Sequence, residues 1–241
     1  MAMLRITLVN TKGGCGKTTL ATNLASYFAG QGFRTTLMDY DPQGSSRQWL
    51  SLRGEHLPPI NGVDAVRQKI GVTRSWQLRA GLDTEVLVVD TPAGVNGSQM
   101  IELLRQADVI LIPVMPSLVD MQATADFIDH LIRVGKIKSL SKQVGIVANR
   151  LRAGSRSQRA LEEFLRGYDI PVVARLRDSQ NYVNAMEEGQ GIHELHPRTA
   201  AKDHEQWSPL IDWLNHDAQG VAPILKGSGA MGARIDEAMS C

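Results

Sequence analysis

Residues 10–20, NTKGGCGKTTL, concentrate residue types that bind phosphate. Phosphate oxygens need several donors that converge on a small volume, and a glycine-rich turn between a strand and a helix points successive backbone N–H groups inward. Lys17 would reach the β- and γ-phosphates of a nucleotide, and the Thr18 hydroxyl would hold Mg²⁺. A dinucleotide-binding fold is disfavoured because the G-x-G-x-x-G pattern is absent. The predicted nucleotide-binding residues of this loop are Gly13, Gly14, Cys15, Gly16, Lys17, Thr18 and Thr19.

The beginning of this loop departs from the usual pattern. The motif G-x-x-x-x-G-K-[ST] requires a glycine at position 11, where this chain has Thr11 followed by a second lysine, Lys12. Lys17 already serves the phosphates of its own loop, so Lys12 could reach the γ-phosphate of a nucleotide bound by a facing copy of the protein. A cation supplied in trans can accelerate phosphoryl transfer by several powers of ten. A solvated loop lysine is the alternative, and the residues alone leave both interpretations open.

Two acidic residues at the ends of predicted strands could complete the site. Asp90 ends the apolar run VLVVD, where a carboxylate would hold the water shell of Mg²⁺ beside Thr18. Asp41, in DYDPQG, could orient the attacking water or lie in the outer shell of the metal ion. Structural roles are the alternatives: Asp90 as a helix N-cap, and Asp39 or Asp41 as stabilisers of the turn at residues 42–44.

These residues require a frame in which strands alternate with helices. Predicted strands cover residues 4–9, 34–41, 85–94, 107–117, 141–150 and 170–178. Predicted helices cover residues 18–29, 46–52, 97–107, 118–135 and 155–167, with a last packed helix around Trp207 and Trp213. A loop containing LPPING and one more helix are predicted between residues 53 and 84. Continuous apolar strands are typical of parallel sheets, so we expect an α/β fold of the P-loop NTPase type, mostly parallel, with helices on both faces.

Length and composition are those of one globular domain. The chain has 241 residues, of which 43% are hydrophobic and 21% charged, and this argues against general disorder. We predict one ATPase domain over residues 1–219 and a flexible tail over residues 220–241. Apolar runs are too short to span a bilayer or to form a signal peptide, so a cytoplasmic location is expected.

The cysteines and two of the histidines have simple interpretations. Cys15 and Cys241 are predicted to be reduced thiols, because two cysteines so far apart form neither a disulfide framework nor a metal-ligand pattern. His193 and His196 could ligate a metal ion. With no third ligand in view, we interpret them as surface loop residues.

Positive charge is unevenly distributed along the chain. The whole chain has a net charge of +1, whereas residues 133–177 contain eleven Lys/Arg and three acidic residues, a net charge of +8 that leaves −7 for the rest. Such asymmetry indicates a polyanionic partner. A solvated basic face is the alternative. The candidate DNA-binding residues in this span are Arg150, Arg152, Arg156, Arg159, Arg175 and Arg177.

Three motifs resemble, in order and spacing, those of the ParA/MinD ATPases, which have a deviant Walker A loop. The segment KGGCGKTT (12–19) is similar to their signature K-G-G-x-G-K-[ST], DYDPQGS (39–45) to their Walker A′ box, and VLVVDTPAG (86–94) to their Walker B box. The resemblance covers roughly residues 3–215. It implies an ATPase that uses ATP and Mg²⁺ and forms a face-to-face homodimer when ATP binds.

The resemblance also implies roles for single residues. Lys12 would contact the nucleotide of the partner subunit, and Asp41 would be the Walker A′ acid tied to hydrolysis. Asp90 would be the Walker B acid. Asn149 lies in VANR, which resembles the purine-contacting segment of the family, and is the candidate for contact with the adenine edge.

Two kinds of family member differ in what they bind. ParA-type members bind DNA without sequence preference as ATP-bound dimers, and a partner protein stimulates their hydrolysis, so the resemblance implies association with the nucleoid. MinD-type members, which regulate cell division at the membrane, carry a C-terminal amphipathic helix. Here residues 220–241 are interrupted by proline and glycines and contain no aromatic residue, so no stable membrane anchor is expected. We therefore predict a ParA-type ATPase that positions a plasmid, a chromosome or a protein assembly. A MinD-like regulator and a metabolic ligase of similar fold are the alternatives.

Overall fold

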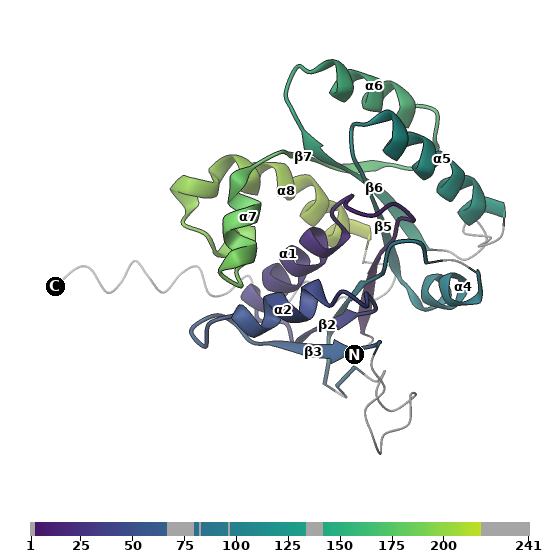
Figure 1. The fold of residues 1–241 in the computed structure, drawn as a ribbon. Helices are drawn as coiled ribbons and strands as arrows, with labels where there is room; N and C mark the ends of the chain where they lie inside the picture. Colours follow the sequence, from purple (N-terminus) through teal and green to yellow (C-terminus); the bar gives the residue numbers. More distant parts are fainter. Residues whose placement is uncertain (1–2, 67–79, 82, 96, 134–141, 218–241) are drawn as a thin grey trace.

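A parallel β-sheet organises the chain (Figure 1). The computed structural model describes residues 3–66, 80–81, 83–95, 97–133 and 142–217. Within these residues the sheet has seven strands in the order β3-β2-β4-β1-β5-β6-β7, and every neighbouring pair is parallel. The strands are β1 (Leu4–Leu8), β2 (Thr35–Asp39), β3 (Ile60–Asp64), β4 (Val86–Asp90), β5 (Val109–Val114), β6 (Gln143–Leu151) and β7 (Val172–Arg177).

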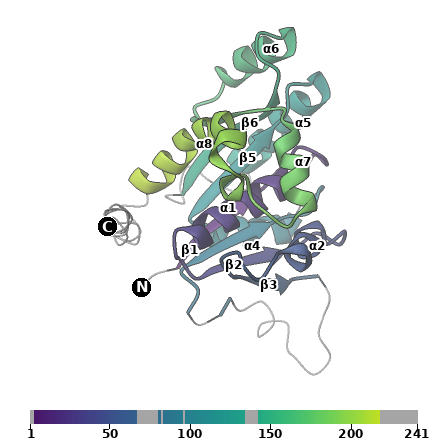
Figure 2. The ribbon, with the colours of Figure 1, turned by 90° about the vertical axis from the view of Figure 1, so that its left-hand side faces the viewer.

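Helices cover both faces of this sheet (Figures 1 and 2). Side chains of α1, α2 and α8 pack on one face, and side chains of α4, α5 and α6 pack on the other. The helices are α1 (Lys17–Gly30), α2 (Ser45–Leu52), α4 (Gly97–Gln106), α5 (Leu118–Arg133), α6 (Arg156–Leu165), α7 (Gln180–Glu187) and α8 (Pro197–Asp217), and η2 (Ile192–Glu194) is a 3₁₀ turn. None of the helices in the described part of the chain is long and apolar enough to cross a membrane.

The pattern of buried residues explains why these segments adopt these conformations. Every residue of β4 and β5 is buried, because each strand has neighbours on both sides and a helical layer on each face. Along α1, the fully buried Leu20, Leu24 and Phe28 recur every four residues, so they form one stripe along the helix that packs against the sheet.

The register of the strands brings the carboxyl ends of the strands to one edge. Asp39 at the end of β2 is the register partner of Asp90 at the end of β4 on one side and of Asp64 at the end of β3 on the other. β1 pairs with β4 up to Leu8 and leads into the glycine-rich loop at the same edge. Ligands of open α/β sheets bind at this edge, so the fold places the loop and the acids together.

The six strands predicted from the sequence are confirmed, and so is the α/β fold. The prediction of a loop around LPPING is wrong in part, because Ile60–Asp64 forms β3. This strand lies at the edge of the sheet and is only half-buried, so it lacks the continuous apolar run by which the inner strands are recognised. Helix α7 was not predicted. The further helix expected before residue 84 falls mostly on residues outside the described part of the chain, as does the tail at 220–241.

His193 was predicted to be a surface loop residue, and the structure corrects this. It belongs to η2 and is half-buried. Its ring lies 5.1 Å from that of His204 in a stacked arrangement and also contacts the rings of Tyr27 and Trp207. The residue therefore packs where α1, η2 and α8 meet. His196, by contrast, is exposed.

Candidate nucleotide-binding site

The glycine-rich loop follows β1 and ends at the first residue of α1. Gly14 and Gly16 have φ angles of 77° and 102°, in the left-handed region that favours glycine. Space is limiting as well: a Cβ atom added to Gly16 would lie 2.1 Å from Nδ2 of Asn149. Glycine at position 16 is therefore required by both the backbone conformation and the close approach of β6.

Lys17 lies inside this loop. Its ammonium group donates to the carbonyl oxygens of Asn10 and Lys12, both at 3.0 Å, and the side chain is almost completely buried. The amino end of α1 begins at the same residue and adds the positive end of the helix dipole. The loop thus concentrates positive charge where phosphate groups are expected to bind.

Asn10 fixes the start of the loop and was missed by sequence reasoning. Its Nδ2 donates to Pro113 O at 2.8 Å and to Thr124 Oγ1 at 3.2 Å, and its Oδ1 accepts from Lys12 N at 3.0 Å. The backbone of Lys12 is therefore held from both sides, because its carbonyl also accepts from Lys17. The only sequence signal for this role is a polar residue that directly follows an apolar strand.

The side chain of Lys12 differs from its backbone in its hydrogen bonding. It is partly exposed, and among the described residues its ammonium group makes no hydrogen bond or ion pair. The two lysines of the loop therefore have different environments: Lys17 donates to loop carbonyls, whereas the Lys12 ammonium group has no partner among the residues that the structure describes.

Asp90 is a buried carboxyl group at the centre of this edge, with an exposed fraction of 1%. Its Oδ2 accepts a hydrogen bond from Ser46 Oγ at 2.5 Å. Burial raises the pKa of Asp90 to about 6, although the hydrogen bond from Ser46 and the nearby Thr18 hydroxyl oppose this shift. The other oxygen, Oδ1, is buried and has no hydrogen-bond partner among the described residues.

This arrangement fits a magnesium ion. An orphaned, buried carboxylate oxygen beside a threonine hydroxyl is the kind of site that Mg²⁺ occupies, since Mg²⁺ prefers oxygen ligands and keeps several of its waters. No group of three or more His, Cys, Asp or Glu side chains able to hold a metal ion is present in the described ranges. Thr18 and Asp90, the latter through water, would accordingly act together with the phosphates of a nucleotide.

Asp39 and Asp41 have different environments, although they are two residues apart. Asp39 is buried and accepts from the backbone nitrogen of Asp41 at 2.8 Å and from Arg47 N and Nε at 3.3 Å. Burial raises the pKa of Asp39, and these hydrogen bonds oppose the shift. Arg47 also pairs with Asp64. Asp39 therefore stabilises the turn and the strand ends, as its structural interpretation predicted.

Asp41 faces a cavity instead. It is partly exposed, and its Oδ1 accepts only a short-range hydrogen bond, from Gln43 N at 2.9 Å. The cavity, of about 510 Å³, lies between the loop after β2 and the segment after β4, with Gly94 on its wall. Gly94 N donates to Thr11 O at 2.9 Å, so this segment is tied directly to the glycine-rich loop. The Asp41 carboxylate is therefore partly exposed beside a segment that contacts the glycine-rich loop.

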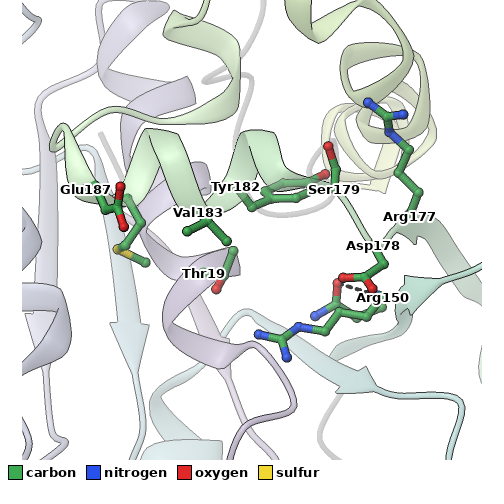
Figure 3. A pocket seen from close by; sticks show the side chains of 10 residues that line it. Thr19, Arg150, Arg177, Asp178, Ser179, Tyr182, Val183 and Glu187 are labelled. Atoms are coloured by element: carbon green, nitrogen blue, oxygen red, sulfur yellow. Dashed lines mark hydrogen bonds between the residues drawn. The ribbon is translucent and has the colours of Figure 1, made fainter.

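A second cavity, of about 440 Å³, adjoins the glycine-rich loop on the α7 side (Figure 3). Thr19 of α1 and Val183 of α7 face one another across it. Its lining consists of Thr19, Asn149, Arg150, Arg177, Asp178, Ser179, Tyr182, Val183, Met186 and Glu187. This is a volume in the range of small-molecule pockets, and its place beside the loop suits the base or ribose of a nucleotide.

Asn149 connects this cavity to the loop. Its Nδ2 donates to Cys15 O at 2.9 Å, and its Oδ1 accepts from Arg150 N at 2.9 Å. Arg150 has a φ angle of 52°, which is strained for a residue with a side chain. Asn149 thus supports the loop from β6, a role not foreseen from the sequence, while its contact with adenine stays a prediction.

The six arginines that were predicted to bind DNA have different environments in the structure. Arg177 points away from the cavity towards α8 (Figure 3), where its guanidinium donates to both carboxylate oxygens of Asp203 at 2.7 and 2.9 Å. Asp203 is completely buried, and hydrogen bonds from Arg177 and Asn181 lower its pKa despite its burial. This ion pair argues against a DNA contact at Arg177, because a buried carboxylate requires its partner.

The other five arginines are exposed. Arg150 lines the cavity, and Arg152 pairs with Asp178 at 3.1 Å. Arg156 and Arg159 lie on α6, one helical turn apart, and make no ion pair with any residue in the described ranges. Arg175 lies on β7 beside α8. The charges most available to a polyanion are therefore those of α6 and β7.

Comparison with known proteins agrees with this geometry. Residues 6–192 match the model of the family described as "CobQ/CobB/MinD/ParA nucleotide binding domain". The chain belongs to the ParA/MinD family. This ParA/MinD chain is 27% identical, over 206 residues, to the maintenance of carboxysome distribution protein A of Halothiobacillus neapolitanus. The alignment covers 80% of this chain and 88% of that protein.

Solved structures of this family share the fold. The apo McdA structure from Cyanothece superposes with a TM-score of 0.68 at 16% identity, covering 87% of this chain and 100% of that one. The septum site-determining protein MinD of Pyrococcus horikoshii, solved with Mg-ADP, superposes with a TM-score of 0.64 at 16% identity, covering 92% and 100%. The fold of this ParA/MinD chain is therefore one in which Mg-ADP has been observed in another protein.

Proposed function

We propose that this chain is a ParA-type ATPase that dimerises when it binds ATP and Mg²⁺. In that state it binds DNA without sequence preference and so associates with the nucleoid. Hydrolysis to ADP and phosphate, slow until a partner protein stimulates it, releases the DNA. The domain that we assign to this activity spans residues 1–219, whereas residues 220–241 lie outside the described part of the chain. Repetition of this cycle positions a cargo.

The observation that supports this proposal is the ammonium group of Lys12, which has no ion-pair partner in the part of the chain that the structure describes. Lys17 is enclosed by loop carbonyls and is suited to the phosphates of its own nucleotide. Lys12 is anchored through its backbone while its ammonium group makes no ion pair within the described ranges. A cation held in this way at the edge of the site is suited to a phosphate that arrives on a second subunit, where it would stabilise the charge of the transition state.

The remaining residues have complementary roles in the proposed reaction. Lys17 and the loop N–H groups bind and orient the triphosphate, and Thr18 and Asp90 hold Mg²⁺, which when bound neutralises charge on the phosphate oxygens. Asp41 orients the attacking water from the accessible side of the site. Asn149 keeps the loop in position and contributes to adenine binding.

The nature of the cargo is supported by similarity in sequence. The relative from Halothiobacillus neapolitanus aligns over most of both chains and is named for the maintenance of carboxysome distribution. A protein assembly is therefore the cargo that we propose, in preference to a plasmid or a chromosome.

A DNA mobility-shift experiment tests the proposal. The full chain is mixed with a nonspecific DNA fragment and Mg²⁺ in the presence of ATP, ADP or no nucleotide, at two salt concentrations. We expect a shift only with ATP and much weaker binding at the higher salt, because phosphate contacts release counterions. Equal shifts with ATP and ADP, or none at low salt, would refute the proposal. If the chain instead floats with liposomes in the presence of ATP, the MinD-like alternative is supported.

A further inference from the structure

Ser46, which directly follows the DYDPQGS segment (39–45), contacts Asp90, the predicted Walker B acid. It lies in the first turn of α2 and is completely buried. Its hydroxyl donates to Oδ2 of Asp90 at 2.5 Å across 44 residues of sequence. A hydroxyl that donates to a carboxylate makes a short, charge-assisted hydrogen bond. Ser46 was not among the site residues predicted from the sequence. It is one of two adjacent serines, and nothing in the local sequence distinguishes it from Ser45.

The hydrogen bond makes the two carboxylate oxygens of Asp90 unequal. Oδ2 is occupied by Ser46, whereas Oδ1 is buried without a partner among the described residues. Rotation of the carboxyl group would break the Ser46 contact, so the bond holds the group in one orientation. Oδ1 is thereby kept available to a water molecule of the Mg²⁺ shell, beside the Thr18 hydroxyl.

We propose that Ser46 is a positioning residue for Mg²⁺: by holding Oδ2 of Asp90, it orients Oδ1 towards the metal-bound water. This inference rests on the proposed function, because it assumes that a Mg²⁺–nucleotide complex binds at the loop. Partners that orient a ligand of a metal ion typically change its affinity by 10- to 100-fold when they are removed.

A purely structural role for the Ser46 hydroxyl is disfavoured by the other attachments of α2. Arg47 binds Asp39 through its backbone and its side chain, and it pairs with Asp64. At the other end of the helix, Arg53 forms a nearly buried, two-pronged ion pair with Glu194. Trp49 Nε1 also donates to Gln190 O at 3.1 Å. Loss of one hydroxyl therefore leaves α2 attached at several points.

The test is the Mg²⁺ dependence of nucleotide binding rather than activity. A fluorescent ADP analogue is titrated with the full chain in EDTA and then at increasing Mg²⁺ concentrations. For Ser46→Ala we expect the affinity in EDTA to stay within about twofold of wild type, while the Mg²⁺ concentration for half-maximal enhancement rises roughly tenfold. Ser46→Thr, which retains a hydroxyl, should restore most of the wild-type Mg²⁺ dependence.

Ser51→Ala is the matched control. Ser51 lies on the same helix, is exposed, and donates to Gln48 O at 2.7 Å within the helix. Nucleotide binding by Ser51→Ala should therefore depend on Mg²⁺ as in wild type. An unchanged Mg²⁺ requirement in Ser46→Ala overturns the inference. So does a parallel loss of affinity in EDTA and in Mg²⁺, which indicates a structural role. A wild-type chain that binds Mg-ADP but never shifts DNA defeats the proposed function and leaves this inference intact.

Discussion

Two lysines five residues apart show how the surroundings of a side chain decide its role. The ammonium group of Lys17 donates to the carbonyl oxygens of Asn10 and Lys12. Lys12 has its backbone hydrogen-bonded at both N and O, whereas its ammonium group is unpaired within the described part of the chain. Truncation of Lys12 should therefore remove a charge without deforming the loop.

We predict that Lys12→Ala reduces ATP hydrolysis by at least about a hundredfold, because a cation supplied in trans contributes 10³- to 10⁵-fold in related phosphoryl transfers. ATP affinity should stay within a few-fold of wild type. Steady-state phosphate release and binding of a fluorescent ATP analogue measure the two quantities. Lys17→Ala serves as the contrast, since it should lose nucleotide binding itself. Normal turnover by Lys12→Ala would exclude a role in trans.

At the scale of the elements, the packing of α1, η2 and α8 around His193 should make the stability of the fold depend on pH. His193 is packed there among the rings of Tyr27, His204 and Trp207, and Nε2 of His193 is buried without a hydrogen-bond partner among the described residues. Burial lowers the pKa of His193 to about 4, the charge of His204 acts in the same direction, and Glu194 opposes them. The folded state therefore disfavours the protonated ring.

The sign of the pH effect follows from linkage. In the unfolded chain this histidine has a pKa of about 6.5, so between about pH 6.5 and pH 4 the unfolded state binds more protons and stability is lost as the pH falls. The lowered pKa corresponds to roughly 1–2 kcal/mol of lost stability between pH 7 and pH 5. The variant His193→Phe keeps a ring but cannot titrate, so it should lose less stability over this interval.

Urea denaturation at pH 7 and pH 5 measures this difference. The control is His196→Phe, because His196 is exposed and lies three residues away. It should show the same pH dependence as wild type. If His193→Phe and wild type lose equal free energy of unfolding between the two pH values, the ring of His193 is not the origin of the effect.

At the scale of the whole molecule, the distribution of arginines without an acidic partner among the described residues indicates which surface is suited to DNA. The chain as a whole is nearly neutral, and several of its arginines are paired with acids, as Arg177 is with Asp203 and Arg166 with Glu163. Arg156 and Arg159 are exposed on α6 without such a partner within the described ranges. These two residues are the strongest candidates for contacts with the phosphates of DNA.

We predict that Arg156→Ala combined with Arg159→Ala weakens ATP-dependent DNA binding by about tenfold or more, while ATP affinity is unchanged. The slope of log K against log [salt] should become shallower by about 2, because each phosphate contact contributes nearly one unit. Fluorescence anisotropy over a range of salt concentrations measures both effects.

The matched control removes two positive charges elsewhere. Arg34 and Arg105 are exposed and lie outside α6, so the double variant Arg34→Ala, Arg105→Ala has the same net charge as the test variant. It should bind DNA nearly as wild type does. Equal losses in the two double variants would mean that net charge, and not the face of α6, governs binding.

The sequence by itself determined the parts of this protein that depend on local pattern. The apolar runs of the inner strands, the glycines and Lys17 of the loop, and the acids at the strand ends lie within short segments, and their spacing is enough to predict a P-loop α/β fold. β3 was missed because it lies at the edge of the sheet and is only half-buried. α7 was missed because Ala185 is its one buried residue, so it has no apolar stripe.

Only the tertiary structure decided which side chains meet. Ser46 reaches Asp90, Asn149 reaches the loop, and Arg177 reaches Asp203 across 44, 134 and 26 residues of sequence. No local pattern contains such pairings, because they arise from strand order and from the docking of helices on the sheet. They make Ser46 a hydrogen-bond partner of the buried Asp90 and engage Arg177 in an ion pair with the buried Asp203.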